Sequence, residues 1–584
     1  MIRSCRHDIS IAGDRNAQCG TLAAMLCFVL IVAPPSRLRA EVGIRFVNEA
    51  PARGILPYVM ESGSGGGLAA ADFDGDGDID VFVPNAEGHP DQLYQNQGNG
   101  TFRDVANDVG LASTAGARCA LWFDYDGDHD LDLLVVNDDE TRSSTFTLYA
   151  NDQGRFEDAT SAAALNIPLP PRIDSDTVPY RGGLGASDLN GDGYLDLFVS
   201  TWNGKSQLLF NNGDGTFRNA TGTAGINTAL HYGHQPAFLD FNGDGLQDIY
   251  LAVDFLWNAL YMNNGDETFS DHAAEAGLDN AMNDMGMTLG DVDADGDFDI
   301  YITNIFQPFQ YNVLFRNDSA PGRMSFTEIA RQSGTDYGGW GWGTTFLDAD
   351  NDGRPDIAAT NGWSGSPHDN DKSVFYHNRS GRTPQFDNLS GATGYNDSEW
   401  GSGLVALDID RDGDADLMQT CNQGPLLLLV NHRQRLSRER HFVTVKPRMD
   451  GPNHFAIGAI VRIESENTRG MRQIHAGTSF LSQEPAEAHF GLGPDTMVER
   501  LVVEWPDGTV TDKRRVTGDQ VVVIRHGGQG DFNADGRIDG NDYRNWQACH
   551  QTRDCDGRCR AADINRDCAI DLRDFATFQI RYKP

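Results

Sequence analysis

Long apolar stretches and basic residues are both scarce in this sequence. The 584 residues include 46 Lys and Arg against 85 Asp and Glu, which gives a formal net charge of -39. Such a charge repels the phosphates of nucleic acids and the headgroups of anionic membranes, so we expect neither as a partner. Outside the N-terminal region, no apolar run approaches the roughly 18 residues of a membrane span, so no stable span is expected after processing.

The acidic composition does not indicate a disordered chain. Disordered chains combine high charge with few apolar residues, whereas here 39% of the residues are hydrophobic and 9% are aromatic. The length suffices for about three or four domains. The acidic residues must therefore belong to particular features of a folded protein.

The N-terminal region, residues 1–40, has the pattern of a secretory signal peptide. Basic residues precede an apolar run from Leu22 to Pro34, and Leu38-Arg39-Ala40 offers a cleavage site after Ala40. An uncleaved anchor is the alternative. The pattern predicts a secreted protein that is extracellular or held at the cell surface.

Cysteine is scarce outside the two ends of the chain. Three of the nine Cys lie in the predicted signal peptide, and Cys119 and Cys421 stand alone. The other four crowd near the C-terminus, where disulfides would stabilise a small exported domain: Cys549, Cys555, Cys559 and Cys568. Four Cys allow three pairings, among which the sequence does not choose. A zinc site is a weaker alternative, because no C-x-x-C pair is present.

An acidic repeat dominates the chain. The pattern D-x-[DN]-x-D-G-x-x-D, with some departures, begins seven times at intervals of 51 to 64 residues: Asp72, Asp124, Asp188, Asp240, Asp291, Asp348 and Asp408. Each copy follows a segment of small and apolar residues and precedes an apolar strand, a second strand that ends in Asn, and a Gly turn with Phe. About four short strands per repeat are typical of propeller blades. We therefore expect a mainly β protein whose residues 41–435 form a seven-bladed β-propeller.

The two ends of the repeat region complement each other. Residues 43–48 resemble the Phe-containing end of a repeat, whereas the seventh repeat stops at Asn431 without such an end. We expect the N-terminal strand to complete the last blade. A ring closed in this way leaves no exposed sheet edge.

The acidic loops have the chemistry of calcium sites. Calcium takes six to eight oxygen ligands at about 2.3–2.6 Å, and Mg²⁺ rarely occupies such all-protein cages. Solvated polar turns are the alternative, but closely spaced carboxylates without a cation would repel one another. Asp78 would contribute its main-chain carbonyl. The predicted ligands are Asp72, Asp74, Asp76, Asp78 and Asp80; Asp124, Asp126, Asp128 and Asp132, with His129 in the place of Gly; Asp188, Asn190, Asp192 and Asp196; Asp240, Asn242, Asp244 and Asp248; Asp291, Asp293, Asp295 and Asp299; Asp348, Asp350, Asp352 and Asp356; and Asp408, Asp410, Asp412 and Asp416.

These repeats resemble the FG-GAP and VCBS repeats, the calcium-binding blades also found in the propellers of integrin α-chains. The resemblance covers roughly residues 43–435. From their position in the loops, we expect the cations to be structural and to pin the turns between strands.

Residues 436–526 lack the acidic loop and alternate as strands, which predicts a small β domain. Four stretches resemble an ASPIC/UnbV domain: residues 456–459, 477–483, 489–493 and 503–508. Such a domain follows FG-GAP repeats in the cartilage acidic protein-like family. The resemblance implies an architecture and no general catalytic activity.

Residues 527–584 contain two twelve-residue loops of EF-hand type, each followed by a helix-like run. They resemble a type I dockerin, a small α-helical domain, although Cys568 replaces the turn Gly of the second loop. The resemblance implies two further calcium sites, about nine in all, and a cohesin-type scaffold as a partner. The implied ligands, including two main-chain carbonyls, are Asp531, Asn533, Asp535, Arg537 and Asp542, and Asp563, Asn565, Asp567, Ala569 and Asp574.

The sequence favours a binding or adhesion module over an enzyme. No G-x-S-x-G motif is present, and most paired carboxylates belong to the calcium loops, so we name no catalytic residue. Six Trp in the repeat region would suit recognition of an extracellular protein or glycan, or would pack between blades: Trp202, Trp257, Trp340, Trp342, Trp363 and Trp400. The alternative function is a polysaccharide-active enzyme, a glycan lyase or hydrolase, on a propeller scaffold.

Overall fold

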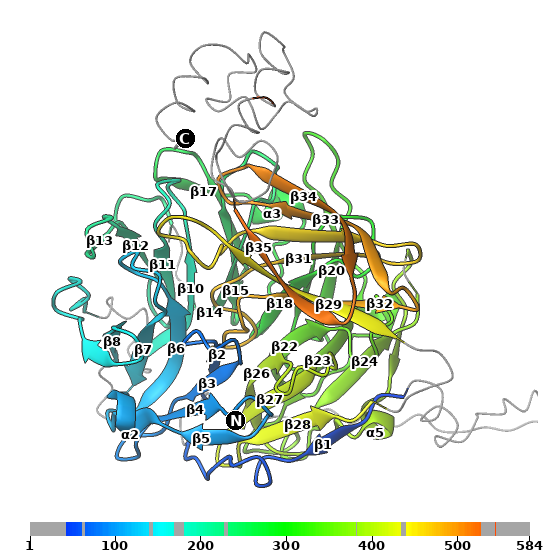
Figure 1. The fold of residues 1–584 in the computed structure, drawn as a ribbon, viewed down its shortest axis with the longest axis horizontal. Coiled ribbons are helices and arrows are strands. Elements are labelled where there is room, and N and C mark those ends of the chain that lie inside the picture. The colour runs from blue at the N-terminus through cyan, green and yellow to red at the C-terminus, as the bar shows by residue number, and fades with distance from the viewer. Residues whose placement is uncertain are drawn as a thin grey trace, which may run out of the picture.

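The computed structural model describes residues 43–60, 65–138, 144–168, 180–226, 232–380, 382–433 and 440–526, together with Arg544 (Figure 1). The predicted signal peptide and almost all of the dockerin-like region lie outside these residues. Within them, none of the helices has the length and apolar character needed to cross a membrane.

In this part of the chain, seven antiparallel four-stranded sheets are built from residues 46–431. Six of them follow the chain order: β2 (Ala69–Ala71), β3 (Asp80–Val83), β4 (Gln92–Asn96), β5 (Phe102–Asp104); β6 (Ala117–Phe123), β7 (Asp132–Asp138), β8 (Ser144–Asn151), β9 (Phe156–Asp158); β10 (Tyr180–Ser187), β11 (Asp196–Trp202), β12 (Gln207–Asn211), β13 (Phe217–Asn219); β14 (Gly233–Leu239), β15 (Asp248–Val253), β16 (Ala259–Asn263), β17 (Phe269–Asp271); β18 (Met287–Gly290), β19 (Asp299–Ile302), β20 (Val313–Asn317), β21 (Phe326–Glu328); and β22 (Gly341–Leu347), β23 (Asp356–Asn361), β24 (Val374–Asn378), β25 (Phe386–Asn388). Four short helices follow the last strands of four sheets: α2 (Ala106–Val109), α3 (Ala273–Ala276), α4 (Ala330–Ser333) and α5 (Ser390–Thr393).

The seventh sheet joins the two ends of the repeat region. It contains β26 (Gly401–Leu407), β27 (Asp416–Cys421) and β28 (Leu427–Asn431), and its fourth strand is β1 (Phe46–Asn48). Phe46 lies opposite Asn431 in the antiparallel pair of β1 and β28. The prediction that the N-terminal strand completes the last sheet is confirmed.

The sheets are arranged in a ring. The first strand of each sheet contacts the first strands of the neighbouring sheets, and β2 contacts β26, which closes the circle. The buried apolar side chains form clusters between adjacent sheets. One cluster, for example, joins Val81 and Tyr94 of one sheet to Met418 and Leu428 of the seventh. This arrangement is consistent with a β-propeller, and the protein is mainly β as expected.

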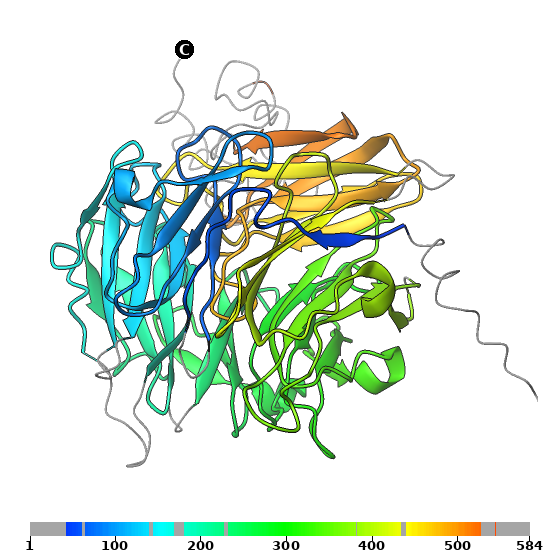
Figure 2. The same cartoon turned by 90° about the horizontal axis from the view of Figure 1, so that it is seen from below.

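The segment after the ring forms a smaller β unit, which we call the β domain. It contains a three-stranded sheet in the order β32 (Ala488–Gly493), β29 (His441–Arg448), β35 (Gln520–Arg525), and a four-stranded sheet in the order β31 (Arg469–Gln473), β30 (Ile460–Glu464), β33 (Met497–Glu504), β34 (Val510–Thr517). Figure 2 shows these yellow and orange strands stacked against one side of the ring.

Residues 474–487 of the β domain enter the centre of the ring, and we call them the central segment. Its main chain forms isolated bridges to the first strands of three sheets: Ala476 with Ala186, Ser479 with Met287, and Gln483 with Ala69. Its side chains and main chain bond to the other four sheets, through Trp122, Gln235, Thr344 and Ala406. The central segment thus touches every sheet of the ring.

Close approach at the centre requires glycine. Gly477 has φ 95°, and a Cβ atom there would lie 2.2 Å from the carbonyl oxygen of Leu184. Phe480, at the tip of the central segment, is fully buried between His234 and Trp342. The middle of the ring is therefore occupied by protein.

Candidate metal sites

Each acidic loop joins the first and second strands of its sheet. The last Asp of each loop opens the second strand and is at most 2% exposed. One of its carboxylate oxygens accepts the N–H of the second loop residue at 2.9–3.3 Å, and the other accepts the N–H of the Asn that ends the third strand at 2.7–2.8 Å. These seven buttressing residues are Asp80, Asp132, Asp196, Asp248, Asp299, Asp356 and Asp416.

The first Asp of a loop accepts N–H groups from the turn that follows it. In the third loop, for example, Gly193 donates its N–H to Asp188 at 2.9 Å. In the second loop His129 stands where Gly is expected. It adopts φ 78° and donates its N–H to Asp124 at 3.1 Å. The departure from the sequence pattern therefore leaves the loop geometry unchanged.

Among the described residues, carboxylate oxygens converge closely enough to share one cation in at least four loops. One oxygen from each of three Asp lies within 4.8 Å of the others in the first, second, fifth and sixth loops: Asp72, Asp74 and Asp80; Asp124, Asp126 and Asp132; Asp291, Asp293 and Asp295; and Asp348, Asp350 and Asp352. In the third and fourth loops the amide of Asn190 or Asn242 instead bonds a neighbouring Asp, at 3.0 and 2.9 Å.

Buried oxygens without a hydrogen-bond partner indicate whether the loops could hold a cation. One carboxylate oxygen of Asp72, of Asp293 and of Asp408 is buried and accepts no hydrogen bond. A buried charged oxygen without a partner is costly. Hard oxygen ligands gathered in this way suit a divalent cation such as calcium, which Asp72, Asp293, Asp408 and their loop neighbours would hold.

The electrostatics of the loops agree with this interpretation. Burial, followed by the charge of neighbouring carboxylates, raises the pKa of Asp80 and of Asp132 to about 8. Burial and the adjacent Asp412 raise the pKa of Asp408 to about 7. Without a cation, ionisation of these groups near neutral pH is thus opposed by the fold.

Three protein cations reach the carboxylates of the sixth loop, whereas Lys446 lies 3.8 Å from Asp72 of the first loop and Arg53 lies 3.4 Å from Asp410 of the seventh. Arg440 lies 2.7 Å from Asp350, Arg354 pairs with Asp352, and His377 lies 3.0 Å from Asp356. The pKa of His377 rises to about 9 through the charges of Asp356 and its neighbours, although burial lowers it. Sequence reasoning missed these residues. The only local signal was a His directly before the Asn that ends the third strand.

The β domain is seated on the acidic loops. Lys446 of β29 donates to the carbonyl of Gly77 at 3.0 Å, and Arg462 of β30 donates to that of Gly296 at 2.8 Å. Arg440 bonds the carbonyl of Asp350 at 3.0 Å. Loops of three sheets thus form part of the contact with the β domain.

Asn side chains connect neighbouring sheets beneath the loops. The Asn that ends the third strand donates its side-chain amide to the carbonyl of the second loop residue in the preceding sheet, at 2.7–3.3 Å. The pairs run from Asn96 to Ile409, Asn151 to Phe73, Asn211 to Tyr125, Asn263 to Leu189, Asn378 to Val292 and Asn431 to Ala349. Sequence reasoning noted these Asn only as markers of a strand end.

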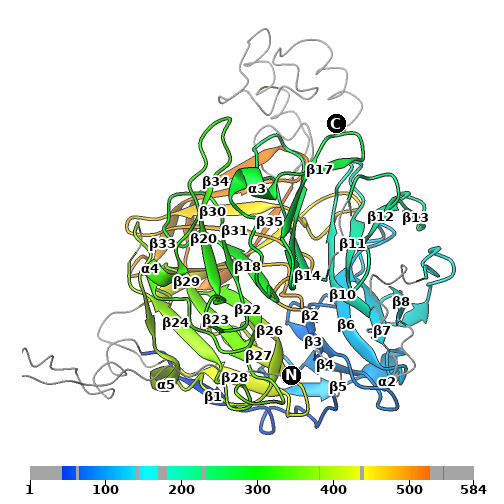
Figure 3. The same ribbon diagram turned by 180° about the vertical axis from the view of Figure 1, so that it is seen from behind.

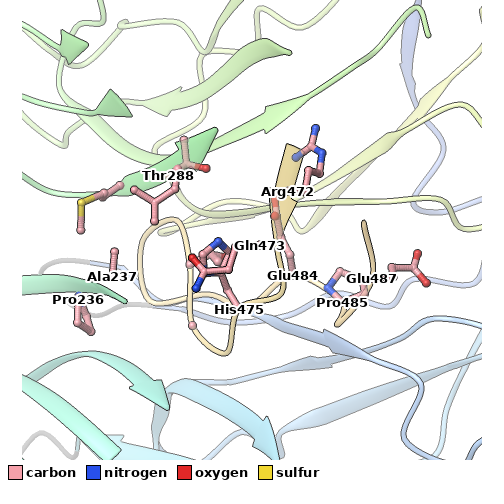
Figure 4. A pocket seen from close by; sticks show the side chains of 13 residues that line it. Pro236, Ala237, Thr288, Arg472, Gln473, His475, Glu484, Pro485 and Glu487 are labelled. Atoms are coloured by element: carbon pink, nitrogen blue, oxygen red, sulfur yellow. The ribbon is translucent and has the colours of Figure 1, made fainter. Parts of the chain in front are cut away.

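A polar pocket lies between the β domain and the ring, with Arg472, Gln473, His475 and Glu484 in its wall (Figure 4). Arg472 donates to the carbonyls of His489 and Phe346, and Glu484 accepts from the N–H of Ala406 at 3.2 Å. Burial and Arg472 lower the pKa of His475 to about 4. The charged groups here bond both units, so they contribute to the docking of the β domain.

Of the six Trp singled out in the sequence, Trp202 donates its ring N–H to Asp254 at 3.2 Å, and the other five divide into two groups. Trp340, Trp342 and Trp363 stack on one another, with ring centroids 4.4 Å apart for Trp340 and Trp363, and Trp400 makes an edge contact with Trp363. Trp342 of β22 is buried, and the other three are half-buried. Trp257, by contrast, is 62% exposed.

The remaining candidates from the sequence are the cysteines and the dockerin-like loops. Cys119 and Cys421 are both buried and free. The dockerin-like ligands and the four C-terminal Cys lie outside the described residues.

Comparison with known proteins identifies two kinds of segment. Residues 72–135, 188–251 and 240–302 match the FG-GAP-like repeat, and residues 449–531 match the ASPIC and UnbV family. The chain is 25% identical to cartilage acidic protein 1 of Homo sapiens over 354 residues, which cover 59% of this chain and 44% of that protein. It is 24% identical to the Mus musculus protein over 476 residues, 66% of this chain and 70% of that protein. The chain thus spans less than half the length of the human relative.

Among solved structures, BBS1N in its complex with ARL6DN matches with a TM-score of 0.40 and 12% identity, over 67% of this chain and 98% of that chain. This score is too low to transfer a function. The sequence matches are more informative: the chain carries FG-GAP-like repeats and an ASPIC and UnbV domain, and it is similar in sequence to cartilage acidic protein 1.

Proposed function

We propose that this protein is a secreted, calcium-stabilised, seven-bladed propeller that acts as an extracellular binding module. The observation that carries the proposal is the set of buried, unpartnered carboxylate oxygens in the acidic loops. Bound calcium would supply the charge that compensates them and would fix the turns between the first and second strands. The role of the metal is therefore structural.

The occupied centre of the ring supports binding rather than catalysis. The central segment bonds all seven sheets, so a substrate has no open path along the axis of the ring. The β domain covers the ends of the sheets that carry the acidic loops. The loops at the opposite ends, between the second and third strands, are the surface that we assign to a protein or glycan ligand.

The tail of the chain would attach this module to a partner. We infer that residues 527–584 form a dockerin-like pair of calcium loops that binds a cohesin-type scaffold. A pull-down of the full chain with an immobilised type I cohesin tests this, with Asp531→Ala and Asp563→Ala together as the variant that should lose binding. If the immobilised cohesin retains the wild-type chain no better than the double variant, the assignment is overturned.

The experiment for the main proposal is thermal unfolding of the purified full chain with calcium and after chelation. We expect a large fall in the unfolding temperature on chelation, reversed by calcium and only weakly by Mg²⁺. An unfolding temperature that does not respond to chelation would overturn the proposal.

A further inference from the structure

Exposed aromatic rings gather on the loops at the opposite ends of the sheets from the acidic loops. Because strands alternate in direction, the connection from the second to the third strand of each sheet lies away from the β domain (Figure 3). Two such loops and one connection between sheets carry five large exposed rings, which we call the aromatic rim: Phe255, Trp257, Phe306, Phe309 and Tyr337.

The rim is exposed to an unusual degree for aromatic side chains. Trp257 is 62% exposed and Phe309 is 89% exposed. Soluble proteins rarely leave such rings in water without a binding partner. Phe255 also adopts φ 64°, the left-handed region that favours glycine, so its exposed side chain is kept at an energetic cost.

Contacts between the loops join the segments that carry the rim. Phe306 and Tyr337 are in edge contact at 5.0 Å, and the N–H of Phe306 bonds the carbonyl of Gly339. The loop that carries Phe255 and Trp257 connects to the next sheet through buried amides. Asn283 donates its side-chain amide to Asp254 at 2.6 Å and its main-chain N–H to Asn304 at 3.1 Å.

A rigid base supports the rim. Ile305, next to Phe306, forms a bridge with Trp340, which stacks on Trp363 with ring planes 9° apart. Asp284 accepts from the amides of Asn258 and Asn280, at 2.5 and 2.8 Å. The loops that carry the rings are therefore anchored before a ligand arrives, which reduces the entropic cost of binding.

The charge around the rim selects among ligands. Residues 254–258, 303–312 and 336–340 contain no Lys or Arg, and their polar side chains are amides, hydroxyls and carboxylates. Arg331 reaches these loops, but it lies 3.8 Å from Asp336 and over the ring of Tyr311, so its charge is already paired. A phosphate, sulfate or uronate would therefore meet no unpaired cation in these three segments and would face the carboxylate of Asp336. Flat aromatic faces beside amide and carboxylate groups fit the apolar faces and the hydroxyls of sugar rings.

We propose that the aromatic rim binds a neutral polysaccharide chain. This inference rests on the proposed function and specifies the ligand class of the same binding module. The ligand lies across Trp257 and Phe309, and the binding does not involve the calcium ions, which are at the other ends of the sheets. The alternative is that the rim binds a protein, in which case the chain would not bind polysaccharide.

The test is affinity electrophoresis of the full chain, with calcium, in native gels that contain hydroxyethylcellulose, galactomannan or mixed-linkage β-glucan. Hyaluronan and chondroitin sulfate are the anionic probes. We expect retardation by at least one neutral polymer and none by the anionic ones. Trp257→Ala and Phe309→Ala should each weaken the apparent affinity at least tenfold, whereas 0.5 M NaCl should change it less than twofold.

The matched control is Val510→Ala with Val523→Ala, two exposed apolar residues of the β domain that are 42% and 50% exposed. This variant should bind like the wild type, and all variants should keep the wild-type unfolding temperature. Retardation by none of the neutral polymers, retardation by the anionic ones alone, or equal binding by the rim variants would each overturn the inference. The calcium dependence of unfolding is measured separately, so a failure here is distinguishable from failure of the proposed function.

Discussion

Replacement of Gln483 by Ala tests whether the central segment holds the ring together. The side-chain carbonyl of Gln483 accepts the N–H of Trp122 at 2.6 Å, and its amide donates to the carbonyl of Trp122 at 2.9 Å. Both residues are at most 2% exposed. The amide side chain thus satisfies two main-chain groups of β6 that face the centre of the ring.

The expected loss of stability follows because the variant leaves these two main-chain groups without a partner. A buried polar group left without a partner costs about 1–3 kcal/mol, and a water that enters the vacated space would recover part of this. We therefore expect Gln483→Ala to lower the free energy of unfolding by about 2–4 kcal/mol. Gln97→Ala is the control. Gln97 is exposed and makes one local bond, so its loss should stay within about 0.5 kcal/mol.

The assay is urea unfolding at saturating calcium, followed by Trp fluorescence and checked for reversibility. If Gln483→Ala unfolds at the same urea concentration as Gln97→Ala, the side chain does not support Trp122. The placement of the central segment in the ring would then be wrong. A loss for both variants would point to a general effect of removing Gln and would also contradict the reasoning.

Three further predictions concern the metal loops, the joints between sheets and the thiols. Because the pKa values of Asp80 and Asp132 are raised to about 8, the calcium-free fold binds protons more tightly than the unfolded chain. The contribution of these groups to stability is therefore present below about pH 4 and is lost as pH rises to about 8. The unfolding temperature of the EDTA-treated protein should fall between pH 5 and pH 8 and the increment from calcium should grow, and a calcium increment that shrinks over this range would contradict the assignment. Asn151→Ala should cost about 1–3 kcal/mol in urea unfolding, because it removes amide bonds to Phe73 and Leu131, whereas exposed Asn212→Ala should cost little. Burial raises the pKa of Cys119 to about 12 and that of Cys421 above its usual range, so a thiol reagent should label both only on unfolding, and fast labelling of the native protein would show that they are accessible.

The acidic loops were the most predictable feature, because each site is built from residues within nine positions of one another. The same local signal predicted where His129 sits in its loop. The pairing of β1 with β28 was also predictable, since the repeat lacked one strand at its end and had a spare strand at its start. Both inferences needed only the period of the sequence.

The contacts between sheets, and between the ring and the β domain, were not predictable, because they connect residues that lie far apart in the sequence. Asn96 bonds Ile409 across 313 positions, and Gln483 bonds Trp122 across 361. Neither Asn nor Gln carries a pattern that indicates its partner. The neutralisation of the sixth loop by Arg440 has the same origin. Burial of Trp342 and exposure of Trp257 likewise depend on how the sheets and loops around them pack.

Under the proposed function, stability and recognition belong to opposite faces of the ring. The acidic loops contact the β domain through Lys446 and Arg462, and the central segment extends that contact into the ring. If the loops hold calcium as proposed, a change in calcium occupancy acts first on the contacts between the β domain and the ring. The aromatic rim lies at the other ends of the sheets, on loops whose sequence is free of the metal pattern. Chelation should consequently abolish ligand binding only where it also unfolds the ring, so binding and unfolding measured along one calcium titration should share a midpoint.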